Sequence, residues 1–176
     1  LEKALVSKKT ITFDQVVTGA LTKEYLAVSH RWESAEFPDC SNAQLACIRK
    51  YLAANLQIKW VFYDYMSLPQ RGRTTGYDKD KDDRTPYELA RFMKGLKSIN
   101  VWYGHPYVTT LICDWRMPEG ALNSAPIERR GWCIFERRLS SVRKQGHCCL
   151  NLSGLAGVEG PRWYDLIGAC KAGRFA

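Results

Sequence analysis

The chain has 176 residues, is 45% hydrophobic and 25% charged, and carries a formal net charge of +8. This is the size and composition of one globular domain with a core of its own, and it argues against two domains. No apolar run approaches the ~20 residues of a membrane-spanning helix, and the N-terminus has no signal-peptide pattern, so we expect no membrane partner. Because the sequence begins at Leu1 rather than at a methionine, it fits a domain excised from a longer protein.

The positive net charge is compatible with nucleic-acid binding, and half of the excess positive charge lies in one segment. Residues 128–144 hold six basic and two acidic side chains. Neither a groove-reading motif nor a cluster of metal ligands accompanies them, so we predict no nucleic-acid partner and no metal. A small phosphate ester fits this segment as well as a polymer does, and a merely solvated basic face is the common alternative.

Cysteine usage points to a reducing compartment. The cysteines are odd in number, form no Cys-x-x-Cys pair, and lie partly in apolar stretches. We therefore predict reduced, buried thiols and a cytosolic environment. The seven positions are Cys40, Cys47, Cys113, Cys133, Cys148, Cys149 and Cys170.

The first predicted elements are a strand and a helix, preceded by an N-terminal extension over residues 1–24. Residues 25–29 are apolar, which predicts a buried strand. Ser41 with Gln44 three residues later is the pattern of a capping box, so we predict a helix from that point. Its apolar stripe consists of Leu45, Ile48, Leu52 and Leu56.

A second strand and a second helix follow, separated by a polar segment. Residues 59–63 predict the strand. Residues 71–84 are too long and too polar for a plain connection, and they predict a mobile loop. Thr85, Pro86 and Glu88 then provide a cap, an N1 proline and the Glu of a second capping box. The expected buried face of this helix comprises Leu89, Phe92, Met93, Leu96 and Ile99.

Two further strands and two helices complete the pattern. Residues 107–112 and 148–152 are β-prone and apolar, which predicts strands three and four. A final helix is expected to bury Trp163, Leu166, Ile167 and Cys170. Alternating strands and helices predict an α/β fold: a flavodoxin-like, doubly wound parallel sheet of four or five strands with helices on both faces, in one domain over residues 1–176.

Polar and aromatic side chains follow three of the predicted strands, in residues 29–32, 64–65 and 113–115. In sheets of this class, ligands bind in the crevice beyond the carboxyl ends of the strands. We therefore expect these three segments to meet at one rim, close to the helix that holds Glu136.

Glu136 is the most unusual residue of that helix. Trp132, Phe135, Leu139 and Val142 have the spacing of a buried stripe, and Glu136 lies at its edge beside Trp132 and Cys133. Burial would raise the pKa of this carboxyl and the neighbouring arginines would lower it, and both outcomes stay open. Taken alone, the helix slightly favours the alternative of a surface Glu paired with Arg. The converging strand ends make Glu136 a site candidate.

The ordered motifs resemble a Toll/interleukin receptor (TIR) domain. They are the strand exit Ser29-His30-Arg31-Trp32, the strand ending Tyr63-Asp64, and the helix with Trp132-Cys133-x-x-Glu136. More narrowly, Ser-His-x-Trp, Asp-Tyr-x-Ser-Leu-Pro-Gln and Arg-Gly-Trp-Cys-x-Phe-Glu resemble a TIR-related branch that is also similar to fungal heterokaryon-incompatibility domains. The resemblance covers residues 25–143, and the last quarter of the chain matches least.

The resemblance implies an NAD-consuming enzyme in which Glu136 is catalytic, nicotinamide is released, and ADP-ribose or a cyclic ADP-ribose is formed. It implies NAD as substrate without a further cofactor, self-association into homo-oligomers, and a signalling, toxin or effector role in the cytoplasm, including a host cell's cytoplasm for a bacterial effector. Aromatic side chains suit stacking on the rings, and Arg31 suits the pyrophosphate. The candidate substrate-binding residues are Ser29, His30, Arg31, Trp32, Asp64, Tyr65, Trp132 and Cys133.

Structural roles remain as alternatives for these residues. Trp32 and Trp132 also suit the core, His30 a satisfied structural histidine, Asp64 a loop cap and Cys133 a buried thiol. The competing function is a non-enzymatic, self-associating interaction module of TIR type.

Overall fold

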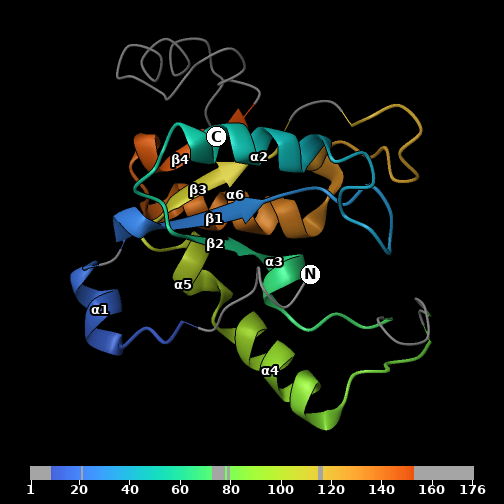
Figure 1. The fold of residues 1–176 in the computed structure, drawn as a ribbon, viewed down its shortest axis with the longest axis horizontal. Helices are drawn as coiled ribbons and strands as arrows, with labels where there is room; N and C mark the ends of the chain where they lie inside the picture. The colour runs from blue at the N-terminus through green and yellow to red at the C-terminus, as the bar shows by residue number, and fades with distance from the viewer. Residues whose placement is uncertain (1–8, 21, 73–77, 79, 115–116, 153–176) are drawn as a thin grey trace.

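A four-stranded parallel sheet forms the centre of the molecule in the computed structural model (Figure 1). The structure describes residues 9–20, 22–72, 78, 80–114 and 117–152. The strands are β1 (Tyr25–Ser29), β2 (Trp60–Tyr63), β3 (Thr109–Ile112) and β4 (Cys149–Asn151), in the order β2-β1-β3-β4. This is the flavodoxin-like order, so the predicted doubly wound fold is confirmed. The predicted final helix lies outside the described residues, as would any fifth strand formed by residues 153–176.

Helices cover both faces of the sheet, as predicted. They are α1 (Phe13–Thr18), α2 (Ala43–Ala53), α3 (Asp64–Ser67), α4 (Pro86–Lys97), α5 (Ile99–Tyr103) and α6 (Gly131–Arg143), with 3-10 turns η2 (Thr22–Glu24), η3 (Ile127–Arg129) and η4 (Gly146–Cys148). Leu26 and Val28 of β1 pack against Ile48 of α2. Tyr25 and Ala27 face the other way, toward α5 and α6. The period of two along β1 thus assigns each side chain to a face.

The buried face of α6 differs from the predicted one. Trp132, Phe135 and Val142 are 44%, 46% and 75% exposed, whereas the buried side chains are Cys133, Glu136 and Ser140. The sheet under α6 presents small polar groups, and the Ser140 hydroxyl donates to Thr110 Oγ1 at 3.3 Å. The predicted apolar stripe is therefore wrong for Trp132, Phe135 and Val142, whereas Leu139 packs against the core. Glu136 and Ser140 add polar groups to the face of α6 that is buried.

The start of α2 also differs. Asn42, with φ 59°, is the N-cap, and its side chain makes no cap hydrogen bond. Asp39 fills that role, because its carboxylate accepts the N–H groups of Gln44 and Leu45 at 3.0 and 2.7 Å. The predicted capping box of Ser41 and Gln44 is absent. In the predicted stripe Ile48 is buried and Leu52 partly so, whereas Leu45 and Leu56 are exposed.

Helix α4 begins as predicted, with Thr85 and Glu88 forming both bonds of the capping box. Its predicted buried face is confirmed only in part: Leu89 and Met93 are exposed, and Phe92 and Leu96 are half-buried. Ile99 is buried as predicted, but it belongs to α5. Gly95 allows α4 to approach the core, because a Cβ there would lie 2.2 Å from Leu68 Cδ2. Residues 73–77 and 79 of the predicted mobile loop lie outside the described residues, so its mobility stays a prediction.

Burial of the cysteines was predicted only in part. Cys113, Cys133, Cys148 and Cys149 are buried free thiols, whereas Cys40 and Cys47 are exposed, and Cys170 is outside the described residues. None of the described helices is long and apolar enough to cross a membrane.

Candidate active site at the carboxyl edge of the sheet

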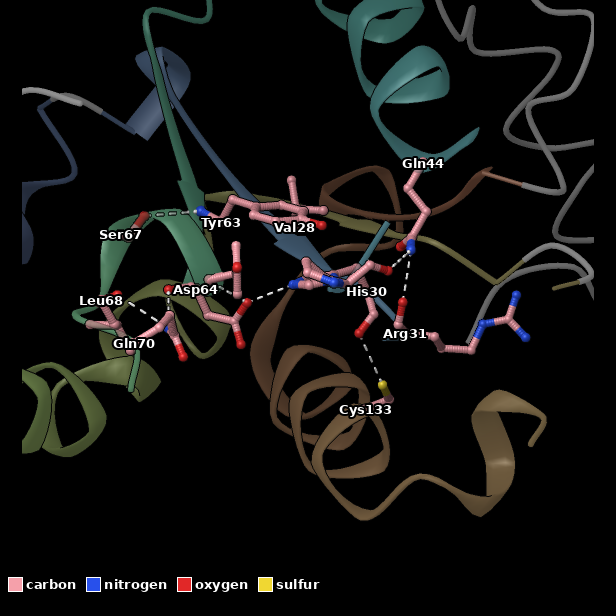
Figure 2. A network of polar contacts seen from close by, with 12 residues as sticks. Val28, His30, Arg31, Gln44, Tyr63, Asp64, Ser67, Leu68, Gln70 and Cys133 are labelled. Carbon is pink, nitrogen blue, oxygen red and sulfur yellow. Dashed lines mark hydrogen bonds and ion pairs between the residues drawn. The ribbon is translucent and has the colours of Figure 1, made fainter. Parts of the chain in front are cut away.

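The strand ends converge as the sequence predicted. Val28 is in register with Tyr63, and Ser29 with Ile112, so His30, Asp64 and Cys113 follow their strands at the same edge. Figure 2 shows His30 and Asp64 pointing toward each other, with Cys133 of α6 beside them. Trp115, the last residue of the third predicted exit, lies outside the described residues.

A tightly held histidine and carboxylate lie at the centre of this edge. His30 Nε2 is 2.6 Å from Asp64 Oδ1, which also accepts the N–H of Tyr65 at 2.6 Å. The His30 ring stacks on the Tyr63 ring, with centroids 4.0 Å apart. The backbone carbonyl of His30 accepts a hydrogen bond from the Cys133 thiol at 3.3 Å. His30 is therefore fixed on three sides, and it orients Asp64.

A cavity of about 630 Å³ opens over this pair. That volume is in the range of small-molecule and cofactor sites. The predicted site residues that line it are His30, Trp32, Asp64, Trp132 and Cys133. Aromatic side chains and one carboxylate thus share a concave surface at the place where α/β sheets bind ligands.

The cavity lining lacks three of the predicted substrate-binding residues, Ser29, Arg31 and Tyr65. Ser29 is fully buried in β1. The Arg31 side chain points away from His30 and Asp64 in Figure 2, and the residue is buried. Side chains alternate along the extended segment after β1, so Arg31 lies outside this cavity, and its contact with a pyrophosphate stays a prediction. Tyr65 packs edge-on against Trp32, with centroids 5.2 Å apart, so it supports the cavity wall from behind.

Glu136 lies beneath the cavity rather than on its surface. It is 1% exposed, one helical turn after Trp132 and Cys133, which line the cavity. Burial is the main cause that raises the pKa of its carboxyl to about 8, and the charge of Asp64 acts in the same direction. The alternative of a surface Glu is therefore wrong, and burial decides the pKa that the sequence left open.

Polar side chains surround Glu136 without satisfying it completely. Ser29 and Tyr103 are fully buried, and the Tyr103 hydroxyl donates to the Val28 carbonyl at 2.8 Å. Neither Ser29 Oγ nor Glu136 Oε2 has a hydrogen bond of normal geometry among the described residues. Burial thus favours the neutral form of the Glu136 carboxyl, which loses its proton as the pH rises.

Fewer basic side chains of residues 128–144 are available to a ligand in the cavity than the composition of this segment suggests. Arg130 lines the cavity but donates to the carbonyls of Trp32, Asn123 and Ala125, which fixes the loop before η3. Arg129 also lines the cavity and is exposed. Arg129 is therefore the candidate for an anionic group of a ligand.

Cys133 contributes a cavity wall rather than a nucleophile. Burial raises the pKa of its thiol to about 12, and the nearby charge of Glu136 acts in the same direction. Because the thiolate is the reactive form, this side chain is inert at neutral pH. The interpretation of Cys133 as a buried thiol agrees with this geometry.

Several cavity residues were not among the candidates from the sequence. Gln70 stands in the quoted Asp-Tyr-x-Ser-Leu-Pro-Gln motif, which was a signal for it. Leu68, Arg130 and Gly131 also stand in the motifs of the sequence analysis, and Arg129 stands in its basic segment. Phe92, Leu96 and Ile99 were predicted as core residues, and nothing local indicated Asn123 or Ala125. The cavity residues without a predicted role in the site are Leu68, Gln70, Phe92, Leu96, Ile99, Asn123, Ala125, Arg129, Arg130 and Gly131.

The chemistry of the site is that of a carboxylate and a second, buried carboxyl under an aromatic cavity. Among the described residues, no group of three or more His, Cys, Asp or Glu side chains could hold a metal ion. No protein-family model matches the chain, and no curated protein or solved structure shows significant similarity to it.

Proposed function

We propose that this protein cleaves NAD at the bond between nicotinamide and ribose, as an NAD glycohydrolase or ADP-ribosyl cyclase. The observation that carries the proposal is the buried Glu136 carboxyl beneath an aromatic cavity at the carboxyl edge of the sheet. Asp64 and Arg129 line that cavity from α3 and η3, so it offers an anionic and a cationic group. NAD needs both, for its pyridinium ring and its pyrophosphate.

The reaction makes a specific demand on the enzyme. Nicotinamide is a cation in NAD, so it leaves with the electrons of the C–N bond without being protonated. The ribose then develops oxocarbenium character, which a carboxylate stabilises, as in glycosidases. A water molecule adds to the ribose carbon and releases a proton, or a nitrogen of the adenine ring adds and forms a cyclic product.

Glu136 would perform this role as the anion. The positive pyridinium ring lowers the pKa of a nearby carboxyl, so substrate binding favours the carboxylate. Since Glu136 is beneath the cavity floor, the proposal requires the Trp132 side chain, which is exposed and one turn away, to move when NAD binds. We extend the proposal to a TIR-like domain that consumes NAD in the cytoplasm as a signalling or effector protein.

Chromatography of the products from NAD tests the proposal. We expect equimolar nicotinamide and either ADP-ribose or a cyclic ADP-ribose, and the second product distinguishes hydrolysis from cyclisation. NAD that stays intact at high protein concentration, where assemblies form, would reject the enzymatic function. The concentration series matters because the activity of self-associating domains depends on assembly.

A second candidate is a self-associating interaction module without enzymatic activity. The outer face of α6 favours it, because the exposed rings of Trp132 and Phe135 lie 5.5 Å apart there. Val142 is exposed about two turns after Phe135, and exposed apolar patches often mark interfaces. The partner would be a second copy of this chain. Concentration-dependent dimerisation without NAD turnover would support this candidate.

A further inference from the structure

Gln70 is held at the cavity with a defined orientation of its amide. Its Nε2 group donates to the carbonyls of Asp64 and Leu68, at 3.4 and 3.1 Å. Two carbonyl acceptors can be served only by the NH₂ end, so the amide cannot be flipped. Gln70 lines the cavity, and Oε1 has no hydrogen-bond partner among the described residues. A fixed acceptor is therefore left for a ligand.

Asp64 supplies a second acceptor from the same short segment. Its Oδ1 atom is engaged by His30 and by the N–H of Tyr65, while Oδ2 has no partner among the described residues. The Asp64 side chain is 14% exposed and lines the cavity. Gln70 is bonded to the backbone of Asp64, so the two acceptors are tied together, as Figure 2 shows.

We infer that Gln70 selects the nicotinamide end of the substrate: its Oε1 accepts an N–H of the carboxamide, while the Asp64 carboxylate faces the pyridinium cation. This inference rests on the proposed NAD cleavage. Nicotinamide in NAD combines an N–H donor with a positive ring, which is what two acceptors and one negative charge recognise. The amino group of adenine is also a donor, but its ring is neutral, so Asp64 favours the pyridinium. Trp32 and Trp132 provide aromatic surfaces for a cationic ring.

A pair of substrates tests the role of Gln70. In 3-acetylpyridine adenine dinucleotide, a methyl ketone replaces the carboxamide, so the N–H donor is lost and the cation is kept. We expect the ratio of kcat/KM for NAD to that for the analogue to fall by about tenfold in Gln70→Met, relative to wild type. Both kcat/KM values are measured on the same preparation of each protein. A smaller fraction of folded enzyme therefore lowers both values equally and leaves their ratio unchanged.

Gln57→Met is the matched control, because Gln57 is exposed in the turn before β2 and far from the cavity in the fold. It should keep the wild-type ratio. If Gln70→Met does not fold, inhibition of the wild type decides: nicotinamide should inhibit about tenfold more strongly than 3-acetylpyridine. An unchanged ratio in a variant that cleaves NAD, or equal inhibition by the two pyridines, would overturn the role of Gln70 alone. Failure of the wild type to cleave either dinucleotide would overturn the proposed function and this inference with it.

Discussion

Replacing Glu136 with Gln is expected to lower kcat/KM for NAD by at least about 100-fold, which is the usual loss when one preorganised electrostatic group is removed from an active site. Gln has nearly the same shape, so the polar layer between α6 and the sheet stays filled. It cannot become negative, so the developing cation on ribose loses its stabilising charge. Nicotinamide release should be measured at pH 8.5, where the Glu136 carboxyl, with a pKa of about 8, is mostly ionised.

Glu119→Gln is the control for that experiment. It makes the same change of charge at an exposed position in the loop before η3. This variant should cleave NAD at the wild-type rate. A folded Glu136→Gln protein with wild-type activity would remove Glu136 from the mechanism.

The same substitution is expected to change the stability of the fold in a pH-dependent way. The folded protein binds the Glu136 proton more tightly than the unfolded chain does, because burial raises the pKa from 4.5 to about 8. Below pH 4.5 both states are protonated, and the residue has no pH-dependent effect. Between pH 4.5 and pH 8 the free energy of unfolding falls as the pH rises. Above pH 8 the full cost of the buried charge remains.

The size of this effect follows from the pKa shift. At about 1.4 kcal/mol per pKa unit, Glu136 lowers the free energy of unfolding of the wild type by roughly 4 to 5 kcal/mol between pH 4.5 and 9. Urea unfolding of the wild type and Glu136→Gln at pH 5 and pH 9 measures it. The stability difference between the two proteins should shift in favour of the variant at pH 9. A difference that is the same at both pH values would mean that Glu136 is not buried as a neutral acid.

The sheet could be predicted because its signals are local. Residues 25–29, 59–63 and 107–112 are short apolar runs bounded by polar segments, and each contains a strand of the structure. The alternation of β1 side chains between the two faces follows from strand geometry, and the convergence of strand ends follows from the parallel topology. The capping box at Thr85 was likewise correct, because both of its partners lie within four residues.

The orientation of α6 could not be predicted from its own residues. Its aromatic side chains have the spacing of a core stripe, yet the face with Cys133, Glu136 and Ser140 is the one that is buried. What decided this lies far away in the sequence, in the small side chains of Ser29 and Thr110. Hydrophobic periodicity assumes a wholly apolar partner surface, and here that surface includes the polar side chains of Ser29 and Thr110.

Only part of the site could be predicted, because some of its residues are positioned by contacts that are distant in the sequence. His30 and Asp64 could be placed together because both follow strands. Gln70 and Arg130 could not be assigned roles, because their bonding depends on the folds of loops: Gln70 turns back on the Asp64 carbonyl, and Arg130 reaches the carbonyl of Trp32. The position of Arg31 outside the cavity could not be predicted, because a side chain at a strand exit can point to either of two faces.

The dependence of NAD cleavage on pH tests most directly whether the buried Glu136 carboxyl performs the chemistry. The kcat/KM value of the wild type reports ionisations of the free enzyme, so it should rise about tenfold per pH unit from pH 6 and level off near pH 8, the pKa of Glu136. A rate that is already constant between pH 6 and 9, with NAD still cleaved, would contradict a mechanism in which this carboxyl must lose its proton.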